Sequence, residues 1–217
     1  MIEAVLFDLD GTLFDRDAAV AEVLSRQVRA FSDVISGSRA TEFVSRVTEL
    51  DAHGLGDKRD VYAAIGTEFG FDSTVVERLV ASFWAEYPRC CRIGAGVTDT
   101  LAELRRRGKR LGIVTNGTAA VQNAAIDALG LRSAVDTIIV SELEGIRKPN
   151  PAIFHRAAFS IETDPRHCCF VGDHPAVDIA GAQAAGLQAF WKRTMYWTPA
   201  APVHTIEAIS DLLSYIS

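Results

Sequence analysis

The chain has 217 residues, of which 48% are hydrophobic and 23% charged, a composition typical of a soluble globular protein rather than of a disordered or membrane protein. With 22 Lys and Arg against 28 Asp and Glu, its net charge of −6 leaves no broad cationic face for nucleic acid or for an anionic membrane. No apolar run approaches the roughly 18 residues of a membrane span. Glu3 and Asp8 interrupt the N-terminus before a signal peptide can form, so a cytoplasmic protein is expected.

The first predicted element is a short buried strand that begins at Ala4 and leads directly to Asp8 and Asp10. Alternate side chains of an extended segment face the same way, so both carboxylates can point out of the carboxyl end of the strand, where open α/β sheets bind ligands. Crowded carboxylates predict a bound cation. Gly11 follows and permits close approach of a ligand to the backbone, and amides exposed at such a turn can bind phosphate oxygens.

Only helical patterns follow, from about residue 16 to residue 87. We predict four helices there: Ala18–Phe31, Thr41–Leu50, Asp57–Phe69, and one that begins near Thr74 and runs toward Pro88. The spacing of Thr74 and Glu77 matches a capping box, which supports the start of the fourth helix. This helical block is inserted directly after the first strand.

After the helical block the pattern changes to alternating strands and helices. Further strands are predicted at Arg110–Val114, Thr137–Val140, Cys168–Val171 and Gln188–Trp191, which makes five in all. Predicted helices cover Thr98–Arg107, Thr118–Leu129, Asn150–Phe159, Ala176–Ala185 and Ile206–Tyr215. Short apolar strands that alternate with helices predict an α/β fold, a doubly wound parallel sheet built from residues 1–15 and 91–217, with residues 16–90 as an inserted all-helical domain.

Further polar residues follow the predicted strands: Thr115 and Asn116 after the second, Lys148 after the third, and Asp173 with Asp178 after the fourth. Because parallel strands present their carboxyl ends at one edge of the sheet, we expect these side chains to converge on the first two aspartates. A hydroxyl, an ammonium and several carboxylates at one edge indicate an active site.

These residues resemble the motifs of the haloacid dehalogenase (HAD) superfamily, in its phosphatase branch with a helical cap of the C1 type. Four motifs are matched in order, by Asp8–Leu13, by Thr115, by Lys148, and by Asp173 with Asp178. The resemblance implies a Rossmann-like catalytic core, with residues 16–90 as the cap domain that closes over it. Fold and chemistry are here inferred by analogy.

The resemblance also implies a role for each matched residue. Asp8 would be the nucleophile that forms an aspartyl-phosphate, and Asp10 would be the general acid and base. The phosphoryl group would be bound by Gly11, Thr115, Asn116 and Lys148. A Mg²⁺ ion would be held by Asp8, by the Asp10 carbonyl and by Asp173, with Asp178 orienting its neighbours.

The predicted function is therefore a Mg²⁺-dependent phosphatase that acts on a small soluble phosphorylated metabolite, as a monomer or homodimer. A phosphomutase shares all four motifs and differs in keeping water from the aspartyl-phosphate. A 2-haloacid dehalogenase needs neither the metal nor a second aspartate, so Asp10 and Asp173 argue against it. A noncatalytic interaction module on the same fold would have lost motif residues, and none is lost.

Other features are interpreted more simply. His174 stands where relatives often carry a small hydroxyl residue; it either tunes the surroundings of the metal site or fills space, and we favour the second interpretation. In the loop at residues 51–60, we predict that His53, Lys58 or Arg59 reaches the active site when the cap closes; the alternative is a solvent-exposed connection between two helices. The four cysteines form two adjacent pairs whose spacing matches neither a redox motif nor a zinc site, so free thiols are expected.

Overall fold

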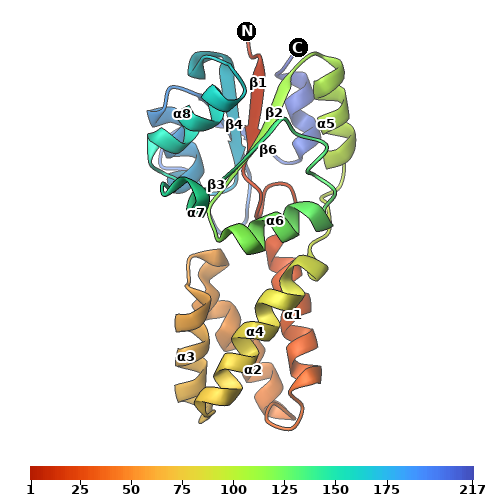
Figure 1. The fold of residues 1–217 in the computed structure, drawn as a ribbon, viewed down its shortest axis with the longest axis vertical. Helices are drawn as coiled ribbons and strands as arrows, with labels where there is room; N and C mark the ends of the chain where they lie inside the picture. The colour runs from red at the N-terminus through yellow and green to blue at the C-terminus, as the bar shows by residue number, and fades with distance from the viewer. The chain divides into compact units, whose positions relative to one another are not determined.

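The computed structural model describes all residues, 1–217, of the chain. The chain divides into two compact units: a larger one of Met1–Asp15 with Arg92–Ser217, and a smaller one of Arg16–Cys91. Figure 1 traces the elements of both. None of the helices is both long enough and apolar enough to cross a membrane.

The larger unit is built on a six-stranded sheet in which every neighbouring pair is parallel, in the order β3-β2-β1-β4-β5-β6. The strands are β1 (Ala4–Phe7), β2 (Arg110–Thr115), β3 (Thr137–Val140), β4 (Cys168–Gly172), β5 (Gln188–Lys192) and β6 (His204–Ile206). The predicted α/β class with a parallel sheet is confirmed.

Helices cover both faces of this sheet, with α5 and α8 on opposite sides in Figure 1. The helices are α5 (Val97–Arg106), α6 (Ala119–Ala128), α7 (Ser141–Glu144), α8 (Pro151–Ser160) and α9 (Gly181–Ala184). Short helical turns cover Pro165–His167, Pro175–Ala180 and Ile209–Ser214. One face packs Leu6 of β1 and Phe170 of β4 against Phe154 of α8, in a core of buried apolar side chains. Apolar residues on both faces explain why the central strands are apolar without alternation.

The register of β1 brings the predicted site residues to one edge. Phe7, the last residue of β1, pairs with Ile113 of β2 on one side and with Val171 of β4 on the other. Asp8 therefore follows β1 where β2 and β4 also approach their carboxyl ends, which is the edge where open α/β sheets bind ligands.

The C-terminal prediction is partly wrong. Where a helix over Ile206–Tyr215 was expected, the chain first forms β6, which pairs with β5 through His204, Thr205 and Ile206, and only Ile209–Ser214 is helical. The Asp211 carboxylate accepts hydrogen bonds from the backbone N–H groups of Glu207 and Ala208 at 2.9 and 3.0 Å, which starts the helical turn after the strand. The sheet therefore has six strands rather than five.

The smaller unit contains four helices, α1 (Arg16–Ala30), α2 (Ser38–Asp51), α3 (Lys58–Phe69) and α4 (Ser73–Cys90), with a short turn at Ala52–Gly54. Its core includes the buried rings of Phe43, Tyr62 and Phe83. The fourth helix begins slightly earlier than expected, because Asp72 rather than Thr74 is the N-cap, its carboxylate accepting from Val75 N–H at 2.9 Å.

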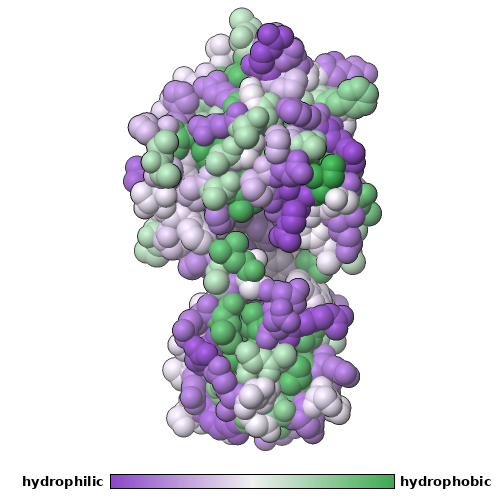
Figure 2. All heavy atoms as spheres, turned by 90° about the vertical axis from the view of Figure 1, so that its left-hand side faces the viewer, coloured by the Kyte–Doolittle hydropathy of each residue, from purple (hydrophilic) through white to green (hydrophobic).

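On the face drawn in Figure 2, apolar residues gather over the middle of the smaller unit between hydrophilic residues, whereas the two kinds are interspersed over the larger unit. The large apolar residues that are exposed come from separate segments: Met1, Leu55, Ile93, Leu143, Phe159, Met195 and Tyr215. Scattered exposure of this kind is ordinary and marks no binding face.

Candidate active site

Asp8 is buried at the end of β1 and is bonded to Lys148. Lys148 Nζ donates to Asp8 Oδ1 at 2.5 Å and to Asp178 Oδ1 at 2.7 Å, and all three side chains are nearly inaccessible. The hydroxyl of Thr12 donates to the other oxygen of Asp8 at 3.3 Å. One buried ammonium thus bonds to two carboxylates that come from different ends of the chain, and the predicted convergence of Asp8, Lys148 and Asp178 is observed.

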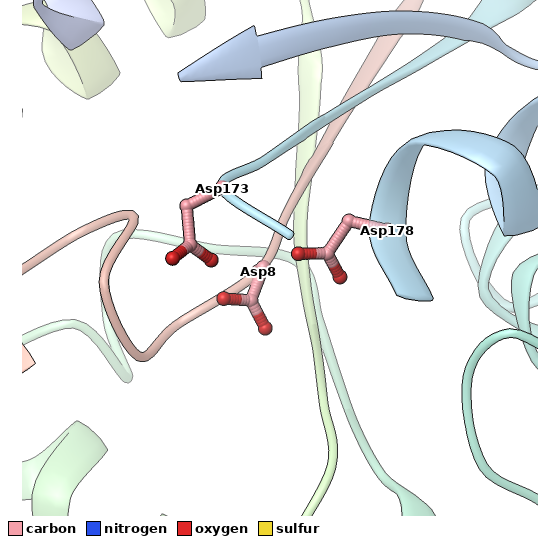
Figure 3. Close-up of side chains that lie close together, drawn as sticks. All are labelled: Asp8, Asp173 and Asp178. Atoms are coloured by element: carbon pink, nitrogen blue, oxygen red, sulfur yellow. The ribbon is translucent and has the colours of Figure 1, made fainter. Parts of the chain in front are cut away.

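Asp173 completes a group of three carboxylates. Carboxylate oxygens of Asp8, Asp173 and Asp178 lie within 4.8 Å of one another, and Figure 3 shows the three side chains drawn together at the ends of their segments. Oxygen donors are the ligands that Mg²⁺ prefers. The donor set therefore fits a hard divalent cation.

The electrostatics of this group also fit a cation. Burial, together with the nearby charges of Asp178 and Asp10, raises the pKa of Asp8 to about 7 despite the opposing effect of Lys148. Burial and the charges of Asp8 and Asp178 raise the pKa of Asp173 to about 8. Both carboxylates resist ionisation in a buried anionic cluster, and a bound cation would relieve that resistance. Burial opposes the charge of Lys148, but the adjacent Asp178 and Asp8 outweigh it and the pKa of Lys148 is raised.

Asp10 lies close to this group without belonging to it. Its charge contributes to the raised pKa of Asp8, yet its carboxylate is not among the three that cluster. Its backbone forms an isolated bridge with Phe14, and the residue is half-buried, whereas Asp8 is buried. The two aspartates after β1 therefore occupy different environments, as two different chemical roles require.

The loop that contains Gly11 is held against Asp173. A Cβ built on Gly11 would lie 2.6 Å from Asp173 Oδ2, so only glycine leaves room for this carboxylate. Lys192 Nζ donates to the Gly11 carbonyl at 2.9 Å, and Trp191 Nε1 donates to the Asp173 carbonyl at 2.7 Å. The end of β5 thus supports both partners. Sequence analysis did not single out Lys192, whose only signal was its place at the end of a predicted strand.

His174 does more than fill space. The ring Nδ1 of His174 accepts hydrogen bonds from the main-chain N–H groups of Ala176 and Val177, both at 3.2 Å. The main-chain N–H of His174 donates to Asp178 Oδ2 at 3.0 Å. Because Nδ1 accepts, the ring proton lies on Nε2, and burial lowers the pKa of His174 in agreement with a neutral ring. The imidazole is therefore an N-cap for the helical turn that carries Asp178, the role that a small hydroxyl residue performs at such positions.

Thr115 ends β2 with its hydroxyl directed at Gln122. Thr115 Oγ1 donates to Gln122 Oε1 at 3.1 Å, and both residues are buried. A hydroxyl has one hydrogen, so Thr115 must turn away from Gln122 to donate to a phosphoryl oxygen. Sequence analysis missed Gln122, which carries no signal that separates it from the other polar residues of α6, Asn123 and Asp127.

Asn116 faces a neighbour that the sequence did not suggest. Its side-chain amide bonds to the main chain of Lys148 at 2.9 and 3.0 Å. The motif comparison predicted that Asn116 binds phosphoryl oxygens. Because Nδ2 carries two hydrogens and one of them bonds to the Lys148 carbonyl, Asn116 has its second Nδ2 hydrogen and its main-chain N–H left for that purpose.

The chain matches a family model described as haloacid dehalogenase-like hydrolase over residues 2–186. It therefore belongs to this family of hydrolases, and the resemblance drawn from the four motifs is confirmed. The match spans the whole of the smaller unit and most of the larger one.

Two characterised relatives have names that identify them as phosphatases. The chain is 30% identical over 193 residues to a glyceraldehyde 3-phosphate phosphatase of Methanopyrus kandleri, covering 86% of this chain and 82% of the relative. It is 30% identical over 191 residues to a phosphoglycolate phosphatase of Rhodospirillum rubrum, covering 86% and 78%. Both matches extend over most of each protein.

Solved structures agree on the fold. A magnesium-bound HAD-hydrolase of Bacillus subtilis, YfnB, aligns over 100% of this chain and 99% of its own with a TM-score of 0.81 at 23% identity. A 2-haloacid dehalogenase of Pseudomonas syringae aligns over 99% and 97% with a TM-score of 0.65 at 28% identity. Because a dehalogenase shares this fold, the fold alone does not distinguish a phosphatase from a dehalogenase, and the choice between them depends on the site residues.

Proposed function

We propose that this chain is a Mg²⁺-dependent phosphatase that hydrolyses a small phosphomonoester through an aspartyl-phosphate on Asp8. The observation that carries the proposal is the position of Asp8, buried at the carboxyl end of β1, bonded to the Lys148 ammonium and grouped with Asp173 and Asp178. The similarity to two phosphatases over most of the chain supports the same reaction.

Two half-reactions follow from the residues. In the first, a carboxylate oxygen of Asp8 attacks phosphorus, the bond from phosphorus to the ester oxygen breaks, and Asp10 gives that oxygen its proton. In the second, Asp10 takes a proton from water, the water oxygen attacks phosphorus, and the bond to Asp8 breaks to release inorganic phosphate. Lys148 balances the charge of Asp8 and of the phosphoryl oxygens throughout.

Asp8 and Asp173, with the Asp10 carbonyl, would hold the Mg²⁺ ion, while Asp178 is engaged with Lys148 and His174. Bound there, the ion would offset the charge of the phosphoryl group and of the nucleophile. The raised pKa values of Asp8 and Asp173 support this division, because these two carboxylates have most to gain from a nearby cation.

Asp10 also separates this proposal from a dehalogenase. Displacement of a halide needs no proton donor for the leaving group, whereas an alkoxide leaving group does, and Asp10, whose charge acts on Asp8, is the residue assigned to supply that proton. A phosphomutase would use the same residues and differ only in what accepts the phosphoryl group.

The test is phosphate release from a panel of about a hundred phosphorylated metabolites, run with Mg²⁺ and with EDTA. We expect turnover that requires Mg²⁺ and is lost in Asp8→Asn and in Asp10→Asn, with folding checked by circular dichroism. Asp127→Asn is the matched control, because Asp127 is an exposed carboxylate of the same unit that pairs with Arg132. Chloride release from 2-chloropropionate without metal, or normal turnover by Asp8→Asn, would contradict the proposal.

A further inference from the structure

The side chain of Asn116 is bonded at both of its polar atoms to the main chain of one residue, Lys148. Asn116 Oδ1 accepts from the Lys148 N–H at 2.9 Å, and Asn116 Nδ2 donates to the Lys148 carbonyl at 3.0 Å. The two residues are 32 positions apart, one directly after β2 and the other in the segment between α7 and α8. A planar amide that bonds to both the main-chain N–H and the carbonyl of one residue fixes the orientation of that residue as well as its position.

Lys148 depends on this amide because of where it lies. It occupies a turn that belongs to no helix or strand, so no regular ladder bonds its peptide groups. The residue is nonetheless buried, and a buried peptide group without a hydrogen bond is costly. Asn116 supplies a partner for both groups. From there the side chain of Lys148 reaches Asp8 and Asp178.

Asn116 is itself anchored on its main-chain side. Gln122 Nε2 of α6 donates to the Asn116 carbonyl at 3.4 Å, and the next N–H in the chain, that of Gly117, donates to Ser141 Oγ at 3.0 Å. The peptide group between Asn116 and Gly117 is thus held at both ends. Gln122 is buried, and a Cβ on Gly117 would lie 2.6 Å from its Nε2, so this glycine makes room for the support.

We propose that Asn116 is a positioning residue that acts through Lys148: its side chain sets the Lys148 main chain so that the ammonium meets the nucleophile Asp8. The inference rests on the proposed phosphatase function. It assigns the Asn116 side chain to the lysine rather than to the phosphoryl group. Charge stabilisation by a preorganised cation acts mainly on the transition state, so the loss of Asn116 lowers kcat and leaves KM nearly unchanged.

The experiment is steady-state kinetics of the full chain with a small aryl phosphate and saturating Mg²⁺. Asn116→Ala removes two hydrogen bonds, and we expect kcat to fall about tenfold while KM changes less than about twofold. Asn150→Ala is the matched control, because Asn150 lies two residues after Lys148 and only caps α8, accepting from Ala152 N–H at 3.0 Å. It is expected to lower the thermal midpoint and to keep kcat.

A second variant separates the role from a general loss of structure. Asn116→Asp keeps the shape and the acceptor for the Lys148 N–H, but it places an oxygen against the Lys148 carbonyl, so kcat should again fall; this variant decides the matter if Asn116→Ala does not fold. In a Lys148→Arg background the ammonium is gone, and Asn116→Ala should then cost less than about twofold. Where Lys148→Arg has no activity, the split between kcat and KM decides.

Three results would overturn the inference. Unchanged kinetics in Asn116→Ala would remove any role. A raised KM at unchanged kcat would mean that the side chain binds substrate directly. An equal loss in the wild-type and Lys148→Arg backgrounds would mean that Asn116 does not act through the lysine. A wild-type protein that releases no phosphate would instead contradict the proposed function and this inference with it.

Discussion

The missing side chain of Gly11 leaves room for the cluster of the Asp8, Asp173 and Asp178 carboxylates. Its φ of +83° is rarely adopted by L residues, and a Cβ there would lie 2.6 Å from Asp173 Oδ2. We expect Gly11→Ala to push the Asp173 carboxylate away from Asp8. Half-maximal phosphate release should then need at least about tenfold more Mg²⁺, because displaced ligands and their supports typically cost metal affinity on that scale.

Gly186→Ala is the matched control for this substitution. Gly186 has nearly the same φ, +81°, but nothing lies within 4 Å of a Cβ built on it. It therefore introduces the same backbone strain without any contact. Both variants should be less stable, and only Gly11→Ala should shift the Mg²⁺ titration. An equal shift in both would mean that strain, and not the Asp173 contact, sets the metal requirement.

Among single residues, sequence analysis predicted best those whose place is set by a local sequence pattern. Asp8 and Asp173 follow apolar strands, and parallel strands bring such residues together whatever the details of packing. The contact of the Asn116 amide with Lys148 was not predicted, because the partner of an amide is chosen by tertiary structure. Nothing in the Thr-Asn-Gly string shows that Asn116 faces Lys148, or that Gln122 is buried beneath it. Hydrogen-bond partners distant in sequence leave no periodic signal.

Among the elements, α1, α2 and α3 are joined by a buried charge cluster. Asp51 at the end of α2 accepts two hydrogen bonds from Arg16 of α1, at 2.7 and 2.9 Å, and a further one from Lys58 at the start of α3. Burial opposes ionisation of Asp51, but the hydrogen bonds and charge of Arg16 outweigh it, and the pKa of Asp51 is lowered. Lys58, one of the three loop residues that the sequence offered for contact with the active site, is thus a buried partner of Asp51.

The cluster predicts unequal effects of its two sides. Asp51→Ala leaves the buried Lys58 ammonium and the part-buried Arg16 guanidinium without the carboxylate they share and should cost about 3–5 kcal/mol, a fall of about 10 °C or more in the thermal midpoint. Lys58→Met keeps the bonds between Arg16 and Asp51 and replaces a buried ammonium, whose pKa burial already lowers, by an apolar chain of similar length. It should shift the midpoint by less than about 4 °C.

Glu68→Ala serves as the control, because the pair of Glu68 with Arg46 is exposed on the same unit and should be worth little. Thermal unfolding followed by circular dichroism measures all three variants. A midpoint for Lys58→Met as low as that of Asp51→Ala would show that the ammonium itself, rather than the shared carboxylate, stabilises the unit.

The prediction that His53 or Arg59 reaches the active site stays a prediction.

Element prediction succeeded where a segment follows one period and failed where two signals compete. The four helices of residues 16–91 and the first five strands carry clear patterns. Near the C-terminus, residues 206–215 show apolar spacing compatible with a helix, yet Thr205 and Ile206 are β-branched residues next to an open edge of β5. The strand is favoured because it satisfies the backbone groups of that edge, which the sequence alone does not reveal.

For the molecule as a whole, the clustered carboxylates of Asp8 and Asp173 make the free energy of unfolding depend on pH. In the unfolded chain a carboxyl titrates near its ordinary pKa of 3.8, whereas in the folded chain Asp8 titrates at about 7 and Asp173 at about 8. Between these values the folded state holds more protons than the unfolded state. The contribution of these two carboxyls to the free energy of unfolding is therefore fully present below about pH 4 and is lost as pH rises toward about pH 8.

Magnesium should oppose that loss, because a cation binds the ionised carboxylates of the folded state only. In EDTA we expect the thermal midpoint to fall as the pH is raised from about 5 to about 8. Mg²⁺ should raise the midpoint little at the lower pH and by several degrees at the higher pH. In Asp173→Asn one titrating group is gone, so the fall in EDTA should be shallower and the effect of Mg²⁺ smaller. Stabilisation by Mg²⁺ that is equal at both ends of the range would place the ion elsewhere than on Asp8 and Asp173, because only binding linked to their ionisation grows with pH.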